Sequence, residues 1–120
     1  METSIGNPQK MKLCIPSVKG VQVVDLQSLI YIEASSNYSH LIFTDRPRIC
    51  ASRPMHTYAT LLEDSNFVRV HKSFVVNLDH VTSYVKGAGS NVLMTDGKAI
   101  DVARSKREIL KQRMREYFKY

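Results

Sequence analysis

Hydrophobic and polar residues alternate in short segments along most of the chain, from Met11 to about Ile100. A period of two places the apolar side chains on one face of an extended strand. The regular βαβ rhythm of a parallel sheet is missing, so the pattern predicts a mainly β fold with small antiparallel sheets. The expected strands span residues 11–15, 20–24, 29–35, 38–44, 48–51, 67–71, 80–86, 91–95 and 98–102.

Turn residues separate these strands. Asp96-Gly97 lies between two alternating segments, and glycine accepts the positive φ that a type I′ hairpin turn requires, so a tight hairpin is expected there. Gly87-Ala88-Gly89 and Asp45-Arg46-Pro47 predict two looser turns.

Two segments follow a helical period instead. Residues 55–62 carry apolar side chains three and four positions apart, and Pro54 can begin this short internal helix. A C-terminal helix is expected after Ser105, whose hydroxyl can form a capping box with Glu108. The apolar stripe of this helix would consist of Leu110, Met114, Tyr117 and Phe118.

The length of 120 residues and the 43% hydrophobic content fit one domain with one core, residues 11–120, after a polar tail or linker remnant at residues 1–10. The net charge is +6, and seven of the 17 basic residues but only two of the 11 acidic ones lie between Arg104 and Tyr120. A basic stretch of this kind is typical of a polyanion binder, although a solvated helix face has the same composition.

The cysteines and apolar runs predict a cytoplasmic location. No apolar run is long enough to span a bilayer, and the first residues lack the apolar core of a signal peptide. Cys14 and Cys50 form no CxxC pair, so we expect free thiols that pack as small apolar side chains in or near strands, and no zinc site.

No catalytic motif stands out, so we expect a protein that is not an enzyme and needs no cofactor. The spacing of His71, Asp79 and His80 does not fit a metal site. The sequence also lacks a G-x-S-x-G nucleophile turn and a glycine-rich phosphate loop.

The most informative segment is Phe67–Leu78, in which polar residues interrupt a dense apolar run. The interruption at Arg69, His71, Lys72 and Ser73 predicts a bend on a rigid anchor. Such a bend can present a lysine to a ligand, or it can be a purely structural turn with a hydrogen-bonded histidine and a solvated lysine.

Three blocks of the chain resemble the LytTR DNA-binding domain, the output module of LytR/AlgR-type bacterial response regulators. The blocks are LIYIEASSNYSHLIF, FVRVHKSFVVNLDHV and TDGKAIDVARSKREIL, and the resemblance covers about residues 12 to 118. It implies roughly ten strands with little helix. It also implies that loops, with no recognition helix, enter successive major grooves of a bent duplex.

The resemblance implies three DNA-contacting loops. In the first loop, Ser39 matches a base-contacting position and is flanked by Asn37, Tyr38 and His40; because serine is short, His40 is the alternative reader. In the second, Lys72 matches a contacting position beside His71. In the third, Arg104 matches a contacting residue, followed by Ser105 and Lys106.

The chemistry of these residues fits DNA to different degrees. Arg104 can present a bidentate fork to O6 and N7 of guanine, and Lys72 can reach either a guanine edge or a phosphate. Further phosphate contacts are expected from Arg46, Arg48, Arg53, Lys106 and Lys111.

The expected function is a sequence-specific DNA-binding domain of a bacterial transcriptional regulator in a two-component system. Its expected ligand is double-stranded DNA with direct repeats, bound as a homodimer or as paired monomers. The resemblance also implies an N-terminal receiver domain and a cognate sensor kinase, so the chain is either an excised output domain or a stand-alone protein. Two alternatives remain: a basic RNA-binding β domain, and a protein-interaction module that uses the C-terminal helix.

Overall fold

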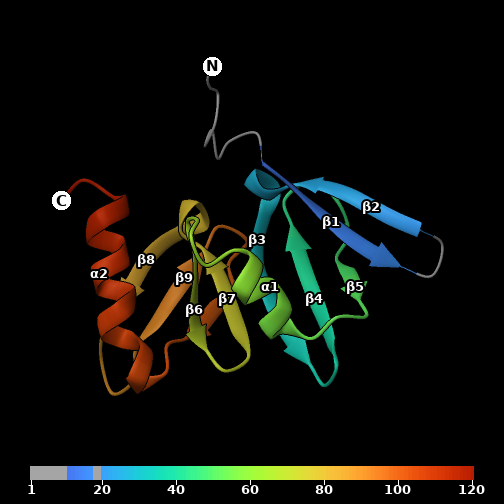
Figure 1. Ribbon diagram of the computed structural model, residues 1–120. Helices are drawn as coiled ribbons and strands as arrows, with labels where there is room; N and C mark the ends of the chain where they lie inside the picture. The colour runs from blue at the N-terminus through green and yellow to red at the C-terminus, as the bar shows by residue number, and fades with distance from the viewer. Residues whose placement is uncertain (1–10, 18–19) are drawn as a thin grey trace.

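Strand β3 (Leu29–Ser35) lies at the centre of a five-stranded antiparallel sheet in this computed structural model, which describes residues 11–17 and 20–120. The strand order in this sheet is β5-β4-β3-β7-β6 (Figure 1). The other strands of the sheet are β4 (Tyr38–Phe43), β5 (Ile49–Ala51), β6 (Phe67–His71) and β7 (Phe74–Asn77). The predicted tail at residues 1–10 lies outside the described residues.

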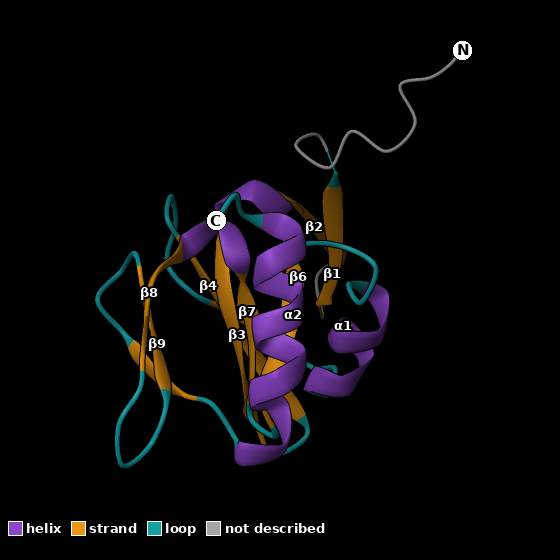
Figure 2. Cartoon of the chain, turned by 90° about the vertical axis from the view of Figure 1, so that its left-hand side faces the viewer, coloured by secondary structure: helices purple, strands orange, loops and turns teal. Residues whose placement is uncertain are grey.

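Layers of secondary structure cover both faces of the central sheet. On one face lie the two-stranded sheet of β1 (Lys12–Ser17) and β2 (Gly20–Asp25) and the helix α1 (Met55–Leu61). On the other face lie α2 (Arg107–Tyr117) and the three-stranded sheet of β8 (Val81–Val85), β9 (Asn91–Met94) and β10 (Ala99–Asp101). Figure 2 shows the central sheet between β8 and β9 on one side and α1 on the other.

Each face has its own apolar core. Ile32, Leu41 and Tyr58 belong to the core under β1, β2 and α1, whereas Val70, Val92 and Leu110 belong to the core under α2 and β8–β10. All six of these side chains are fully buried. Burial of large apolar side chains contributes about 1.5–3 kcal/mol each, so the two cores are the main source of stability.

The predicted mainly β fold is confirmed, but strand β7 was not predicted. Val75 packs into one core and Val76 into the other, so both faces of β7 are buried and the strand shows no alternation. A short continuous apolar run is what a strand covered on both sides looks like.

The hairpin at Asp96-Gly97 forms, with Gly97 at a φ of +92°, but the predicted type I′ turn is wrong. That turn needs two successive residues with positive φ, and Gly97 is the only residue of this hairpin that has one. The Gly97 amide donates to the Met94 carbonyl and the Met94 amide to the Lys98 carbonyl. The loop therefore has three residues and ends in a left-handed glycine.

The two predicted helices are present, with corrections at α2. The predicted capping box is wrong. Residues Arg104–Lys106 form a turn of 3₁₀ helix before α2, and no side chain caps the first residues of that turn or of α2. Leu110, Met114 and Phe118 pack as predicted, but Tyr117 is 42% exposed. None of the helices formed by residues 11–17 and 20–120 is long and apolar enough to cross a membrane.

Both cysteines are free and lie in strands, Cys14 in β1 and Cys50 in β5. Their side chains are exposed, so the expectation that they pack as small apolar groups is wrong.

Candidate nucleic-acid interface

Three loops that are far apart in sequence lie along one edge of the molecule, the lower edge in Figure 1. They are the β3–β4 turn, the β6–β7 turn and the segment 103–106 before α2. Main-chain hydrogen bonds attach two of them to neighbouring strands: the Ala34 amide of β3 donates to the Ser73 carbonyl of the β6–β7 turn at 2.9 Å, and the Ala103 amide donates to the Val70 carbonyl of β6 at 2.8 Å. We call this edge the loop edge.

In the first loop, the turn is tight and strained. Ser35 pairs with Tyr38, so only Ser36 and Asn37 connect the strands, and Ser36 adopts a φ of +58°. This left-handed backbone costs a residue other than glycine about 1–2 kcal/mol. Asn37 and Tyr38 are exposed at the tip, which leaves the Asn37 amide free to meet a ligand.

Ser39 does not point outward from this loop. Its relative exposure is 0%, and its hydroxyl donates to the Arg53 carbonyl at 2.7 Å. The expectation of a base contact by Ser39 therefore has no support in this conformation. The Ser39 hydroxyl instead holds the segment after β5 against β4.

His40 is half-buried and therefore more accessible than Ser39. Its Nδ1 lies 3.1 Å from Nη1 of Arg48. Because a guanidinium can only donate, Nδ1 accepts this bond, and the neutral ring carries its proton on Nε2. His40 can then donate from Nε2 to a base or a phosphate, with Arg48 beside it.

The second loop is held by its own side chains. The Arg69 guanidinium donates to the carbonyls of His71 at 3.3 Å and Lys72 at 2.7 Å. Nδ1 of His71 accepts from the Ser73 amide at 3.1 Å, and its ring lies edge-on to Phe74. Lys72 is left exposed at the tip, so Arg69 and His71 position the turn that presents it.

The third loop presents Arg104. This residue is exposed and begins the 3₁₀ turn that leads into α2, and Lys106 of the same turn is half-buried. Main-chain attachment of Ala103 to β6 fixes the position of Arg104 relative to Lys72.

Known proteins are similar to this chain in sequence and in fold. The family model of the LytTr DNA-binding domain matches residues 19–115. The chain belongs to the LytTR family of DNA-binding domains.

Two curated relatives of this LytTR domain are sensory transduction proteins named LytT. The protein of Bacillus subtilis (strain 168) is 29% identical over 103 residues, which make up 84% of this chain and 42% of the relative. The protein of Bacillus anthracis is 24% identical over 106 residues, 87% of this chain and 43% of the relative. The chain thus spans less than half the length of these relatives.

A solved structure has the same fold. It is the LytTr DNA-binding domain of a putative methyl-accepting/DNA response regulator from Bacillus cereus, with a TM-score of 0.73 and 19% identity. The match covers 88% of this chain and 97% of the solved chain, which confirms the expected LytTR architecture.

The LytTR loop edge contains two groups that the sequence did not single out as site residues. Arg69 was only one of several polar interruptions, and Arg48 was only a phosphate candidate. Strand pairing gives them their roles, because it brings Arg69 under the β6–β7 turn and Arg48 beside His40.

Some of the expected phosphate contacts lie elsewhere in the LytTR domain. Arg46 follows the end of β4 that is remote from the loop edge, where it pairs with Asp45 at 3.4 Å and stacks on Phe43. Lys111 lies in α2, outside the three loops, and pairs with Glu108 at 3.8 Å. We therefore drop Arg46 from the expected DNA contacts, because it faces away from the loop edge.

Proposed function

We propose that this LytTR domain recognises specific duplex DNA through the loop edge. The observation that carries the proposal is the main-chain attachment of the β6–β7 turn to β3 and of the segment 103–106 to β6, with Lys72 and Arg104 exposed on one edge. Loops that are fixed in this way can hold polar side chains at base edges, so no recognition helix is needed.

The exposed side chains suit different parts of the duplex. Arg104 can donate two parallel hydrogen bonds to O6 and N7 of guanine, a pairing worth about 1–3 kcal/mol of discrimination. Lys72, Asn37 and His40 can reach base edges or phosphates from the other two loops. Arg53, which lies behind the first loop, and Lys106 are proposed as phosphate contacts.

The charge distribution supports this orientation on DNA. The chain carries a net charge of +6, yet four carboxylates, those of Glu63, Asp64, Asp79 and Glu116, gather around one pocket away from the loop edge. A positive edge steers the domain toward phosphates and supplies the part of the affinity that does not depend on sequence.

We further propose that the full-length protein is a bacterial response regulator of the cytoplasm. The relatives named LytT are more than twice as long as the matched region, which leaves room for an N-terminal receiver domain that a sensor kinase controls. The DNA site would consist of direct repeats, bound by paired copies of the domain.

Selection of DNA from a random duplex pool tests the function. We expect one sequence to be enriched, with binding that weakens as salt rises, by about 0.9 in log K per log salt for each phosphate neutralised. Gel-shift competition compares the affinity for the selected duplex with the affinity for single-stranded RNA of the same base sequence. Enrichment of no duplex, or stronger competition by the RNA, would contradict the proposal.

An exposed aromatic platform would favour RNA, but the exposed rings are scattered. Tyr38 lies in the first loop, whereas Tyr117 and Tyr120 lie at the other end of the chain. Stacking of successive bases needs neighbouring rings, so we rank RNA below duplex DNA.

Arg69→Ala tests how the second loop is positioned. We expect the affinity for the selected duplex to fall about tenfold, since the carbonyls of His71 and Lys72 lose a charged donor and the turn that carries Lys72 loosens. Fluorescence anisotropy at several salt concentrations measures the affinity. The slope of log K against log salt should stay unchanged, because Arg69 itself contacts no phosphate.

Arg69→Lys is the matched control. A lysine keeps the charge but cannot span two carbonyls with a planar fork, so it should restore only part of the affinity. Full affinity in Arg69→Ala, or a loss of salt slope, would show that Arg69 does not act through the turn.

A further inference from the structure

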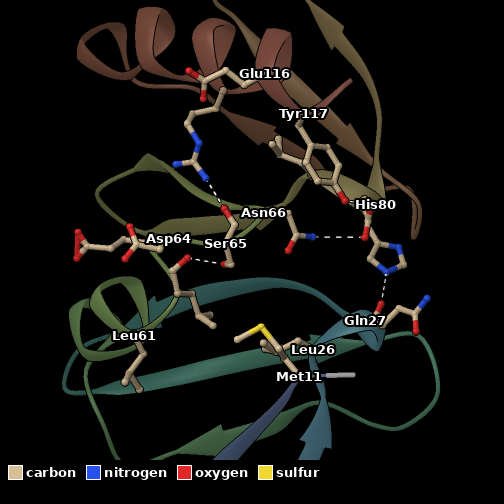
Figure 3. Close-up of a pocket in the computed structure, with 15 residues that line it drawn as sticks. Met11, Leu26, Gln27, Leu61, Asp64, Ser65, Asn66, His80, Glu116 and Tyr117 are labelled. Carbon is tan, nitrogen blue, oxygen red and sulfur yellow. Dashed lines mark hydrogen bonds between the residues drawn. The ribbon is translucent and has the colours of Figure 1, made fainter. Parts of the chain in front are cut away.

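Figure 3 shows a large groove. The elements that line it meet at the end of the domain opposite the loop edge, the upper end in Figure 1. The groove has a volume of about 1170 Å³. Its walls are the turn after α1 (62–66), the 3₁₀ turns Leu26–Ser28 and Leu78–His80, and the last turn of α2. The loops proposed to bind DNA contribute no residue to these walls.

The floor of the groove is apolar and partly uncovered. Leu26, Leu62 and Leu78 form a buried base, while Leu61 is 59% exposed and Met11 is 45% exposed. Single exposed apolar residues are ordinary, but two that converge on one hollow with a buried apolar base indicate a contact surface.

Tyr117 forms part of the wall and is fixed there. Its hydroxyl donates to the Asp79 carboxylate, which also accepts from Asn66. Partial burial, and then the bond to Asp79, raise the pKa of Tyr117 to about 12. The hydrogen bond to Asp79 holds the ring in the wall of the groove.

The rim of the groove is acidic. Glu63, Asp64, Asp79 and Glu116 are all exposed. Within residues 11–17 and 20–120, the ion pairs are Lys12–Asp25, Arg46–Asp45 and Lys111–Glu108, so none of these four carboxylates has a cationic partner there.

Arg113 and His80 also line the groove, and both donate hydrogen bonds to main-chain carbonyls. The Arg113 guanidinium donates to the carbonyls of Ser65 and Phe67. Nε2 of His80 donates to the Gln27 carbonyl at 2.8 Å, because a carbonyl can only accept. The carbonyls do not neutralise Arg113, but four carboxylates against this one guanidinium leave the lining of the groove negative in a chain whose net charge is +6.

We propose that this groove docks a basic segment of a protein partner, with Leu, Met or Phe side chains on the floor and Lys or Arg side chains on the rim. The apolar floor selects against a simple cation, and the acidic rim selects against nucleic acid and acidic peptides. Because the groove lies away from the loop edge, a partner can bind while the domain is on DNA.

A random 12-residue peptide library displayed on phage tests this docking site. We expect wild-type protein to enrich sequences in which Lys or Arg neighbours Leu, Met or Phe. The most enriched peptide, made synthetically, should lose at least tenfold in affinity on Glu63→Lys/Asp64→Lys and on Leu61→Ser, measured by fluorescence anisotropy. These residues are exposed, so the melting temperatures should change little.

Asp101→Lys/Glu108→Lys is the matched control, since it makes the same charge change at exposed positions outside the groove. It should bind the peptide as the wild type does, apart from a small loss through long-range repulsion. No enrichment, enrichment without basic residues, or equal losses in the two double variants would overturn the proposal. Basic peptides whose affinity is unchanged by Leu61→Ser would bind through charge attraction alone, and this result would also overturn the proposal.

Discussion

Asn77→Ala should destabilise the domain by about 3–5 kcal/mol, because it leaves buried polar groups without partners. The relative exposure of Asn77 is 0%. Its amide donates to the carbonyls of Leu29 at 2.8 Å and Leu26 at 3.4 Å, and its Oδ1 accepts from the Asp79 amide at 2.9 Å and from Nδ2 of Asn66 at 2.6 Å. One side chain thus joins the end of β7 to the start of β3 and to two turns.

A loss of this size is a large part of the roughly 5–15 kcal/mol by which a domain is stable. Urea unfolding followed by circular dichroism measures it. Asn91→Ala is the control, since Asn91 is a half-buried asparagine of β9, and its replacement should cost less than about 1 kcal/mol. Equal losses in the two variants would mean that the Asn77 network does not hold the strands together.

The sequence predicted β1 and β10, whose positions alternate between exposed and buried because only one face packs on a core. β3 and β7 both contribute side chains to the two cores, yet β3 was predicted and β7 was missed. β3 has seven residues, whereas β7 has four and directly follows the polar interruption at Lys72 and Ser73, so its apolar run is too short to show a period. Strand pairing is a long-range property, so the central position of β3 and β7 could not be predicted from local patterns.

The sequence predicted where the turns lie but not their backbone conformation. Glycine at 97 marks a positive φ, yet the register of β9 and β10 decides whether the loop has two residues or three. In the same way, Ser105 and Glu108 have the spacing of a capping box, but Ser105 lies inside the 3₁₀ turn that leads into α2 and Glu108 is already the second residue of the helix, so no side-chain cap bond forms.

For the candidate site, the resemblance located the loops, and the fold decided which side chains are accessible. Lys72 and Arg104 are exposed as a DNA contact requires, whereas Ser39 faces inward toward Arg53. The inward direction follows the period of two in β4, which places Ser39 on the same buried face as Leu41 and Phe43. Arg69 was missed as a positioning residue because its role depends on a turn conformation.

Arg104→Ala tests most directly whether the loop edge reads the DNA sequence. On the duplex selected by the wild type, the affinity should fall about tenfold to a hundredfold, which corresponds to the roughly 1–3 kcal/mol of a bidentate arginine–guanine pair. On a scrambled duplex of the same length the loss should stay below about threefold, because only one charge is removed. Anisotropy titrations on both duplexes at one salt concentration give the two ratios.

Arg46→Ala is the matched control, because it removes the same charge at the end of the sheet remote from the loop edge. It should lower the affinity for both duplexes slightly and equally. We predict that only Arg104→Ala reduces the ratio of matched to scrambled affinity. An equal loss on both duplexes with Arg104→Ala, or a loss of discrimination with Arg46→Ala, would contradict sequence reading by the loop edge.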